Sequence, residues 1–390
     1  MNAATRRALS SALAAVAAVS LVACSSDKPK PAPLEAFQPK ITARQAWSAN
    51  IGGGAVASLG NLVGIKAAPT LTMVPAARDG VFFVAASDGT IAALEAATGA
   101  ERWRTKVNGP LSAGIGSDGR YSSVVTRGNE VVTFDGPREI WRKRVASAVV
   151  TPPLVAGERV FVMAVDRSVE AFDVLDGRRL WSFQRPGDAL TLARASVVAA
   201  FGNNLLVAQG PRLTALDPLR GTVQWDVSMA SPRGSNEVER LADLIGPPVR
   251  VGDRVCARAF QAAVACLDAA RGSLLWSKTV GGIQALGGNG DLVFGGDASD
   301  RISAWRASNG DVAWTSEKYL HRGLSGAQVF GPAVVFGDSE GFVHFLAASS
   351  GELQLRLPTD GSAVLGTPAL SGNTLLVTTS KGGLFAFRPQ

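Results

Sequence analysis

The sequence predicts an all-β fold built from many small antiparallel sheets. Glycine accounts for 43 of the 390 residues, a frequency that suits a chain with many tight turns. No stretch after residue 40 keeps the period of an amphipathic helix. Seven of the eight tryptophans recur at intervals of 38 to 56 residues, namely Trp47, Trp103, Trp141, Trp181, Trp225, Trp276 and Trp314. The chain is therefore an array of repeats.

Each repeat has the pattern of four short strands. A glycine stands four residues before the tryptophan in five repeats, at Gly99, Gly177, Gly221, Gly272 and Gly310, and Gly351 stands in the same place before Leu355. An acidic residue stands eight residues before the tryptophan in four repeats, at Glu95, Asp173, Asp217 and Asp268. β-Branched runs alternate with glycine-containing turns, which predicts hairpins. Four antiparallel strands in about 40 residues make one blade of a β-propeller.

Counting the repeats predicts eight blades. Seven repeats end at residues 103, 141, 181, 225, 276, 314 and 355. The C-terminal segments 375–379 and 384–387 supply the middle strands of an eighth blade, and segment 45–50 supplies its tryptophan strand. We therefore expect an eight-bladed β-propeller of four-stranded antiparallel blades over residues 41–390. The N-terminal strand should close it by joining the C-terminal blade, which removes exposed sheet edges.

The recurring tryptophans suggest either a ligand-stacking platform or packing between adjacent blades. Repetition around the ring favours packing, because a ligand site would be unique whereas a packing role recurs. Trp305 falls outside the series, and we expect it in the core.

The N-terminus has the pattern of an export signal. Arg6 and Arg7 precede an apolar run over residues 8–22, which is too short for a comfortable membrane span. The run ends in Leu-Val-Ala-Cys24, which resembles the bacterial lipobox. The resemblance implies that residues 1–23 are a signal peptide and that Cys24 is lipidated. Ser25, rather than Asp, after Cys24 implies the periplasmic face of the outer membrane. Residues 24–40, rich in proline, are expected to be an extended tether that does not pack.

Charge and composition exclude several classes of protein. The net charge is +7, and removal of Arg6 and Arg7 leaves 37 basic against 32 acidic residues, a net charge of +5. These charges are dispersed, so no nucleic-acid partner is expected. Three cysteines and two isolated histidines make a disulfide scaffold or a metal site improbable. Segment 337–341 fits Gly-x-Ser-x-Gly but occupies a hairpin turn, so no catalytic residue is predicted.

Cys256 and Cys266 are ten residues apart on neighbouring predicted strands, on either side of a turn. They can face each other across a hairpin and form a disulfide in an oxidising compartment. Two reduced thiols in the core are an equally good interpretation of the sequence.

The recurring pattern Ala-Leu-Asp-x-x-x-Gly-x-x-x-Trp resembles the pyrroloquinoline-quinone (PQQ) repeat. Two classes of protein carry it, the quinoprotein dehydrogenases and the BamB family of outer-membrane β-barrel assembly lipoproteins. A dehydrogenase would need a calcium ion beside the quinone, acidic ligands, a catalytic Asp and, in many members, a vicinal cysteine pair. Cys256 and Cys266 are not vicinal, and the enzymes are usually much longer. We therefore predict no enzyme activity and no cofactor.

Two connections between repeats resemble segments of the BamB family. The interval between Trp225 and Trp276 is 51 residues and holds a stretch, 237–243, that resembles the family's Glu-(Ile/Val)-(Asp/Glu)-Arg-Leu-x-Asp. The preceding connection holds 189–194, which resembles Leu-x-Leu-Arg. In that family these loops bind the periplasmic POTRA domains of BamA. The resemblance implies a partner-binding set of Leu190, Leu192, Arg194, Glu237, Glu239, Arg240 and Asp243.

Within this set, Leu190 and Leu192 are expected as apolar anchors and Asp243 as a charged contact. The family's Arg aligns with Ala193, so Arg194 is expected to replace it one place later, and a second family Asp aligns with Ile245. Two alternatives stay open. The leucines can belong to an ordinary loop packed on its own blade, and Glu237, Glu239 and Arg240 can form an ion pair within their loop.

The resemblance implies a non-enzymatic scaffold of the outer-membrane β-barrel assembly complex. Its expected partners are the POTRA domains of BamA, other lipoproteins of the complex, the outer membrane through the lipid anchor, and unfolded outer-membrane protein clients. The alternatives are a PQQ- and calcium-dependent quinoprotein dehydrogenase and a generic periplasmic adhesion or glycan-binding propeller.

Overall fold

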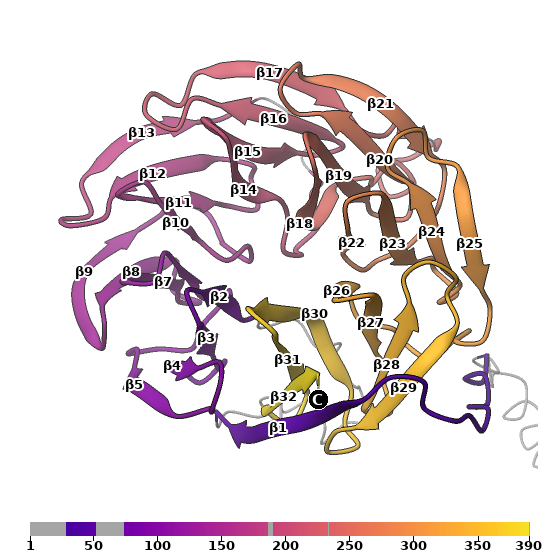
Figure 1. Ribbon diagram of the computed structural model, residues 1–390. Coiled ribbons are helices and arrows are strands. Elements are labelled where there is room, and N and C mark those ends of the chain that lie inside the picture. Colours follow the sequence, from indigo (N-terminus) through magenta and orange to yellow (C-terminus); the bar gives the residue numbers. More distant parts are fainter. Residues whose placement is uncertain (1–28, 52–73, 186–189, 233, 390) are drawn as a thin grey trace, which may run out of the picture.

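The computed structural model describes residues 29–51, 74–185, 190–232 and 234–389. Within them, 32 strands form eight four-stranded antiparallel sheets arranged in a ring (Figure 1). The predicted all-β, eight-bladed propeller is therefore confirmed. The predicted signal peptide and Cys24 lie outside the described residues. No helix in the described part of the chain is long and apolar enough to cross a membrane.

The first four blades follow the chain in order. Blade 1 contains β2 (Ala76–Arg78), β3 (Val81–Ala85), β4 (Thr90–Glu95) and β5 (Glu101–Lys106). Blade 2 contains β6 (Gly116–Ser117), β7 (Tyr121–Val125), β8 (Glu130–Asp135) and β9 (Arg138–Arg144). Blade 3 contains β10 (Leu154–Ala156), β11 (Arg159–Met163), β12 (Val169–Asp173) and β13 (Arg179–Phe183). Blade 4 contains β14 (Val198–Phe201), β15 (Asn204–Gln209), β16 (Arg212–Leu216) and β17 (Val223–Ser228).

The remaining blades complete the set. Blade 5 contains β18 (Leu244–Val251), β19 (Arg254–Ala259), β20 (Ala263–Asp268) and β21 (Ser273–Lys278). Blade 6 contains β22 (Gly287–Gly288), β23 (Leu292–Gly296), β24 (Ile302–Arg306) and β25 (Val312–Ser316). Blade 7 contains β26 (Gln328–Phe330), β27 (Ala333–Gly337), β28 (Phe342–Ala347) and β29 (Leu353–Pro358). Blade 8 contains β30 (Val364–Ser371), β31 (Thr374–Thr379), β32 (Gly383–Pro389) and β1 (Ala43–Asn50).

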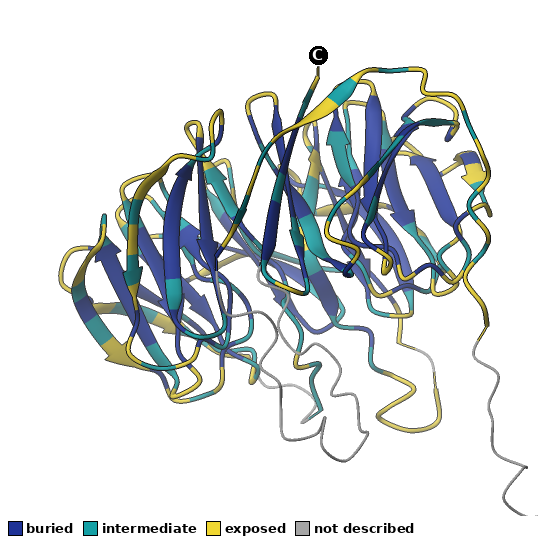
Figure 2. Ribbon diagram, turned by 90° about the horizontal axis from the view of Figure 1, so that it is seen from below, coloured by how far each residue is buried: buried dark blue, intermediate teal, exposed yellow. Residues whose placement is uncertain are grey.

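Blade 8 combines strands from both ends of the described chain. Its outer strand β1 pairs antiparallel with β32, so that Trp47 lies opposite Ala386 and Asn50 opposite Gly383. In every blade the second and third strands are mostly buried, whereas most of the exposed residues lie in the outer strands and in the loops (Figure 2). The core is therefore divided among the contacts between neighbouring blades.

The tryptophans pack between blades, as the repeats predicted. Trp141 of blade 2 lies against Gly177 in the turn before the outer strand of blade 3, where a Cβ atom would come within 2.6 Å of the indole ring. The glycine has φ +69°, which other residues rarely adopt. The indole Nε1 donates to a carbonyl of the same turn at 2.8–3.0 Å in five such contacts, Trp47–Ala96, Trp141–Val174, Trp181–Pro218, Trp276–Ala307 and Trp314–Ala348. These contacts explain the Gly-x-x-x-Trp spacing.

Two departures from the pattern have the same origin. Trp103 faces blade 2, whose outer turn is short, and a Cβ atom on Gly136 there would contact nothing within 4 Å. Leu355 stands in place of tryptophan in blade 7 and faces blade 8, which takes its third and outer strands from opposite ends of the chain. No turn joins those two strands, so blade 8 offers no turn glycine at this position. Trp305 is 2% exposed on β24, which confirms its place in the core.

Cys256 and Cys266 lie directly opposite each other on β19 and β20. Their Cα atoms are 4.0 Å apart and the sulfur atoms are joined in a disulfide. Both residues are fully buried. Of the two interpretations left open by the sequence, the structure contains the bonded pair.

The segment 32–40 differs from the expected tether. Ala32 N–H donates to Leu320 O and Lys40 N–H donates to Gln354 O, both at 2.8 Å. Leu34 and Phe37 are half-buried. The expectation that residues 24–40 do not pack was therefore wrong for this part. Proline prevents the segment from forming a regular strand. Its other residues can still pack against blade 7 and form hydrogen bonds with it.

Candidate functional site

The two predicted loops lie on one face of the ring. Each inter-blade connection leaves an outer strand at the same face as the turn between the second and third strands, and we call this the connection face. Backbone hydrogen bonds join the two kinds of loop, for example from Phe260 N–H to Asp243 O at 2.9 Å. Residues 190–194 lie between blades 3 and 4, and residues 235–243 lie between blades 4 and 5. Together they form what we call the paired-loop surface.

Asp243 joins the two loops. Its Oδ2 accepts a hydrogen bond from Leu192 N–H at 2.8 Å, and its Oδ1 pairs with Arg167 Nη2 at 3.2 Å. Arg167 Nη2 also reaches Leu190 O at 3.5 Å. The side chains of Arg167 and Asp243 are each only 13% exposed. Asp243 therefore holds the 190–194 loop in place, and most of its carboxylate is already engaged inside the protein.

Arg167 occupies an unusual backbone position. It has φ +66° in the turn between β11 and β12, where the corresponding turns of blades 1, 7 and 8 have Gly89, Gly341 and Gly382. A left-handed conformation costs an L-residue about 1–2 kcal/mol relative to glycine. The ion pair between Arg167 and Asp243 offsets this backbone cost. We did not predict Arg167 from the sequence, although an arginine at a glycine position of the repeat was a usable signal.

Arg194 has no hydrogen bond or ion pair with any residue that the structure describes. It lines a small cavity of about 20 Å³ together with Thr151, Arg167, Leu192 and Asp243, a space for roughly one water molecule. Burial lowers the pKa of Arg194, but an arginine stays charged in proteins. A half-buried, uncompensated guanidinium is a ready donor to a partner's carboxylate. Ala193, at the family's Arg position, is exposed, and Ile245 is buried in β18.

The loop before Asp243 forms a single turn. Asn236 Oδ1 accepts from Glu239 N–H at 2.9 Å, and Glu239 Oε2 accepts from Ser235 N–H at 2.8 Å. The hydrogen bond from the Ser235 backbone is the main reason that the pKa of Glu239 is lowered. This arrangement is close to a capping box. Glu239 thus acts within its loop through hydrogen bonds.

The charged neighbours of Glu239 in this loop point to solvent. Glu237 and Arg240 are exposed, and neither side chain forms a hydrogen bond or ion pair with the described part of the chain, although Arg240 N–H donates to Asn236 O at 3.2 Å. Val238 between them is 69% exposed. Leu190 and Leu192 are half-buried. The structure therefore gathers Leu190, Leu192, Arg194 and Asp243 around Arg167, with the 237–240 turn as an exposed neighbour.

The residues present do not fit a quinone site. The cysteines of the blade 5 disulfide are ten residues apart in sequence and fully buried between strands, so they are not the vicinal pair of many quinoproteins. Over the described ranges, no group of three or more His, Cys, Asp or Glu residues could hold a metal ion.

The chain is similar to known proteins along most of its length. A family model described as outer membrane protein assembly factor BamB matches residues 87–316. The BamB of Burkholderia pseudomallei is 34% identical over 382 residues, which cover 96% of this chain and 97% of that protein. The BamB of Bordetella pertussis is 34% identical over 379 residues, with 96% and 95% covered.

Solved structures show the same fold. The crystal structure of BamB from Moraxella catarrhalis has a TM-score of 0.77 at 20% identity and covers 89% of this chain and 100% of that one. A quinohemoprotein alcohol dehydrogenase from Comamonas testosteroni has a TM-score of 0.65 at 14% identity and covers 89% of this chain and 76% of that one. These two likenesses concern the fold alone. The matched family model and the full-length curated relatives show that the chain belongs to the BamB family of outer membrane protein assembly factors.

Proposed function

We propose that this chain is a non-enzymatic scaffold of the outer-membrane β-barrel assembly complex. Lipidated Cys24 anchors it to the periplasmic face of the outer membrane. The paired-loop surface binds the POTRA domains of BamA and so aids the folding and insertion of outer-membrane β-barrel proteins. The names of the curated relatives support the assembly role, and the geometry around Asp243 supports the site.

The bracing of the two loops by Asp243 is the observation that carries the proposal. Its hydrogen bond to Leu192 N–H fixes a loop that otherwise has few backbone partners. A loop that is held in its binding conformation loses less entropy when a partner docks. The fold therefore provides a prepared surface, and Asp243 and Arg167 are its positioning residues rather than its main contacts.

The residues that contact BamA directly are those with solvent-exposed side-chain surface. Leu190 and Leu192 are only half-buried, and Leu192 lines the cavity. Arg194 supplies a positive charge at the same place that no described residue neutralises, and an acidic group of the partner can pair with it. Arginine is enriched among the residues that contribute most to binding energy in interfaces, and apolar neighbours help to exclude water around it. Glu237 and Arg240 form the exposed rim, where charges contribute little to affinity.

The test is recovery of BamA from solubilised envelopes with tagged wild type and variants. We expect Leu192→Asp and Arg194→Glu to lose BamA while keeping the circular dichroism spectrum of the wild type. Val312→Asp is the matched control, since Val312 is 57% exposed on the outer strand of blade 6, away from both loops. It should recover BamA normally. Recovery by every variant would place the contact elsewhere on the propeller.

Absence of BamA in the wild-type lane would contradict the function itself. In that case a dye-reduction assay with added PQQ and calcium tests the dehydrogenase alternative directly. We expect no dye reduction above the rate without protein.

A further inference from the structure

The segment 32–40, which we call the strap, lies along the outer edge of blade 7. In Figure 1 the indigo chain that leads to β1 passes over β29. Its two ends are held by the backbone hydrogen bonds to Leu320 and Gln354. It crosses from the connection face at Ala32 to the opposite face at Lys40.

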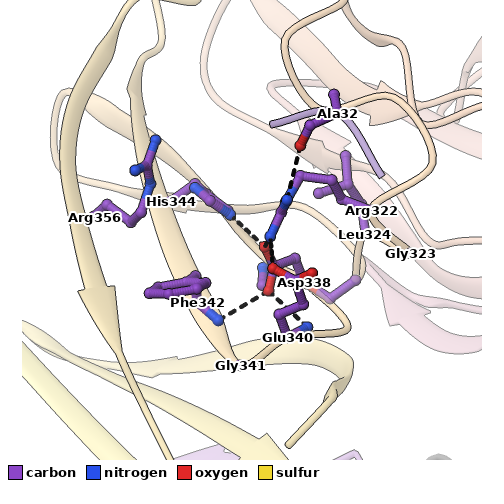
Figure 3. Close-up of polar contacts among 12 residues, drawn as sticks. Ala32, Arg322, Gly323, Leu324, Asp338, Glu340, Gly341, Phe342, His344 and Arg356 are labelled. Carbon is purple, nitrogen blue, oxygen red and sulfur yellow. Dashed lines mark hydrogen bonds and ion pairs between the residues drawn. The ribbon is translucent and has the colours of Figure 1, made fainter. Parts of the chain in front are cut away.

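A buried arginine holds the first end of the strap. Arg322 is 3% exposed, and its Nη1 donates to Ala32 O at 2.8 Å. The rest of its guanidinium is bound by Asp338 at 2.8 Å and by Glu340 (Figure 3). A buried donor left without an acceptor is costly. The docked strap therefore supplies the acceptor that this buried donor needs.

Side chains hold the rest of the strap. Lys318 Nζ pairs with Glu35 at 2.7 Å, and Arg356 Nη1 donates to Glu35 O at 3.3 Å. The Arg356 guanidinium also lies 5.1 Å from the centre of the Phe37 ring, a cation–π distance. Lys40 pairs with Glu352. Ion pairs this exposed are individually weak, so the strap is fixed by the sum of these contacts with the buried Arg322 bond.

The strap also changes the edge of the sheet. Only Pro358 is fully exposed among the six residues of β29, whereas three of the five residues of β25 in blade 6 are exposed. Covering an edge strand with a loop is one way in which proteins prevent unwanted strand pairing. Blade 7 is therefore the side of the ring that the N-terminal segment occupies.

The docked strap shortens the free part of the chain. Seven residues, 25–31, separate Cys24 from Ala32. A fully extended chain advances at most about 3.6 Å per residue, so Ala32 lies within about 29 Å of a lipid on Cys24. If residues 32–40 were undocked, the limit at Lys40 would be about 58 Å. Blade 7 cannot move far from the membrane while the strap is bound.

We propose that the strap orients the propeller, so that the rim of blade 7 faces the lipid headgroups and the paired-loop surface lies farther from them. The two loops of that surface lie between blades 3 and 4 and between blades 4 and 5, two to four blades away from blade 7 in a ring of eight (Figure 1). The proposal rests on the lipidation of Cys24 in the proposed function and is independent of BamA binding. The membrane partner is the headgroup surface, and the strap sets which rim approaches it.

Energy transfer to the membrane tests this orientation. Lipidated full-length protein is reconstituted in phosphatidylethanolamine and phosphatidylglycerol vesicles that carry a headgroup acceptor dye. A donor dye is attached to His321→Cys, beside Arg322, or to Val238→Cys in the 235–243 loop. Both positions are exposed. Cys256 and Cys266 form a disulfide, so they do not react with the dye. We expect higher transfer from position 321 than from position 238. Equal transfer, or higher transfer from position 238, overturns the proposal.

A strap variant separates docking from mere proximity. Glu35→Lys with Phe37→Ala removes an ion pair and a ring contact at the surface without touching the buried Arg322 cluster. The difference in transfer between the two labels should then disappear. Glu101→Lys, which breaks an exposed pair with Arg104 on blade 1, is the control and should preserve the difference. Protein that fails to float with the vesicles also overturns the proposal, whereas BamA recovery in the pull-down would still stand.

Discussion

Blade 7 and the paired-loop surface each depend on an arginine–aspartate pair near the connection face, but the two pairs have different surroundings. In blade 7 the side chains of Arg322 and Asp338 are 3% and 0% exposed. Between blades 3 and 5 the side chains of Arg167 and Asp243 are both 13% exposed. The first pair is covered by the strap, and the second borders a small cavity that Arg194 also lines.

The difference shows how one kind of contact can serve two purposes. Asp338 accepts from Arg322, His344 Nε2 and Phe342 N–H at 2.8–2.9 Å, so its environment is complete without a partner. Asp243 uses its hydrogen bonds to position a loop, and within the described ranges Arg194 beside it has no ion-pair partner. A complete cluster fixes the chain, whereas an incomplete one is prepared for an incoming group. Substitutions at both pairs should therefore differ in what they damage.

The largest effect is expected from Asp338→Ala. It leaves Arg322 buried with a partly lost counter-charge, which typically costs about 3–5 kcal/mol of unfolding free energy. Denaturant unfolding followed by tryptophan fluorescence measures the loss. Asp135→Ala is the control, because Asp135 pairs with Arg120 at the surface, and its midpoint should stay at the wild-type value. Equal midpoints for both variants would show that the blade 7 cluster is not stabilising.

Asp243→Ala should cost less stability and more binding. It removes charged hydrogen bonds to Leu192 N–H and Arg167, each worth about 1.5–3 kcal/mol in buried settings and less here because the pair is partly hydrated. BamA recovery should fall sharply because the 190–194 loop is no longer held. Asp243→Asn keeps an acceptor for Leu192 N–H and should restore much of the recovery. Failure of Asn to restore it would make Asp243 a direct charged contact, as the sequence first suggested.

Arg167→Gly should leave stability almost unchanged. The substitution loses the ion pair with Asp243 but relieves a left-handed backbone that costs about 1–2 kcal/mol. Hydrogen exchange at the Leu192 amide should nevertheless become faster, because Asp243 loses its other partner. Asn129→Gly is the matched control at the same turn position of blade 2, with φ +60°. It should leave exchange at Leu192 unaffected, and slower exchange in Arg167→Gly would contradict the bracing role.

The propeller could be predicted because its determinants repeat. The Gly-x-x-x-Trp spacing reflects one contact made again between successive blades, so each copy supports the others. The exception at Leu355 coincides with the blade whose outer strand is not preceded by a turn, because blade 8 takes that strand from the other end of the chain. The internal role of Glu239 was also readable in principle, because Asn236 and Glu239 have the spacing of a helix-capping pair.

The two arginine–aspartate pairs could not be predicted in this way. Arg167 and Asp243 are 76 residues apart and come together only because the ring places blade 3 beside blade 4. The docking of the strap was not predicted, because a high proline content indicates an extended chain but gives no information about a surface that can bind it. That surface is created by Arg322, whose need for an acceptor at Ala32 appears only after folding.

The smallest effect is a dependence on pH confined to blade 7. Burial is the main reason that the pKa of His344 lies below its ordinary value of 6.5, and the charges of Arg356 and Arg322 lower it further, while the hydrogen bond to Asp338 opposes this. In the unfolded chain His344 binds a proton near pH 6.5, whereas in the folded chain it does so only at lower pH. The free energy of unfolding should therefore fall as the pH drops below 6.5. Burial raises the pKa of Asp338, but its bonds to His344, Phe342 N–H and Arg322 outweigh this and lower it from 3.8, which adds a separate loss in stronger acid.

Melting temperatures measured between neutral pH and pH 5 isolate the histidine. His344→Gln keeps an N–H donor for Asp338 but does not titrate, so its melting temperature should fall less than that of the wild type over this range. His321→Gln is the control, because His321 is exposed in the neighbouring connection and should retain the wild-type slope. The paired-loop surface has no histidine among residues 190–194 and 235–243, so BamA recovery by His344→Gln should match the wild type. A wild-type slope in His344→Gln would show that the buried ring is not the group that takes up the proton.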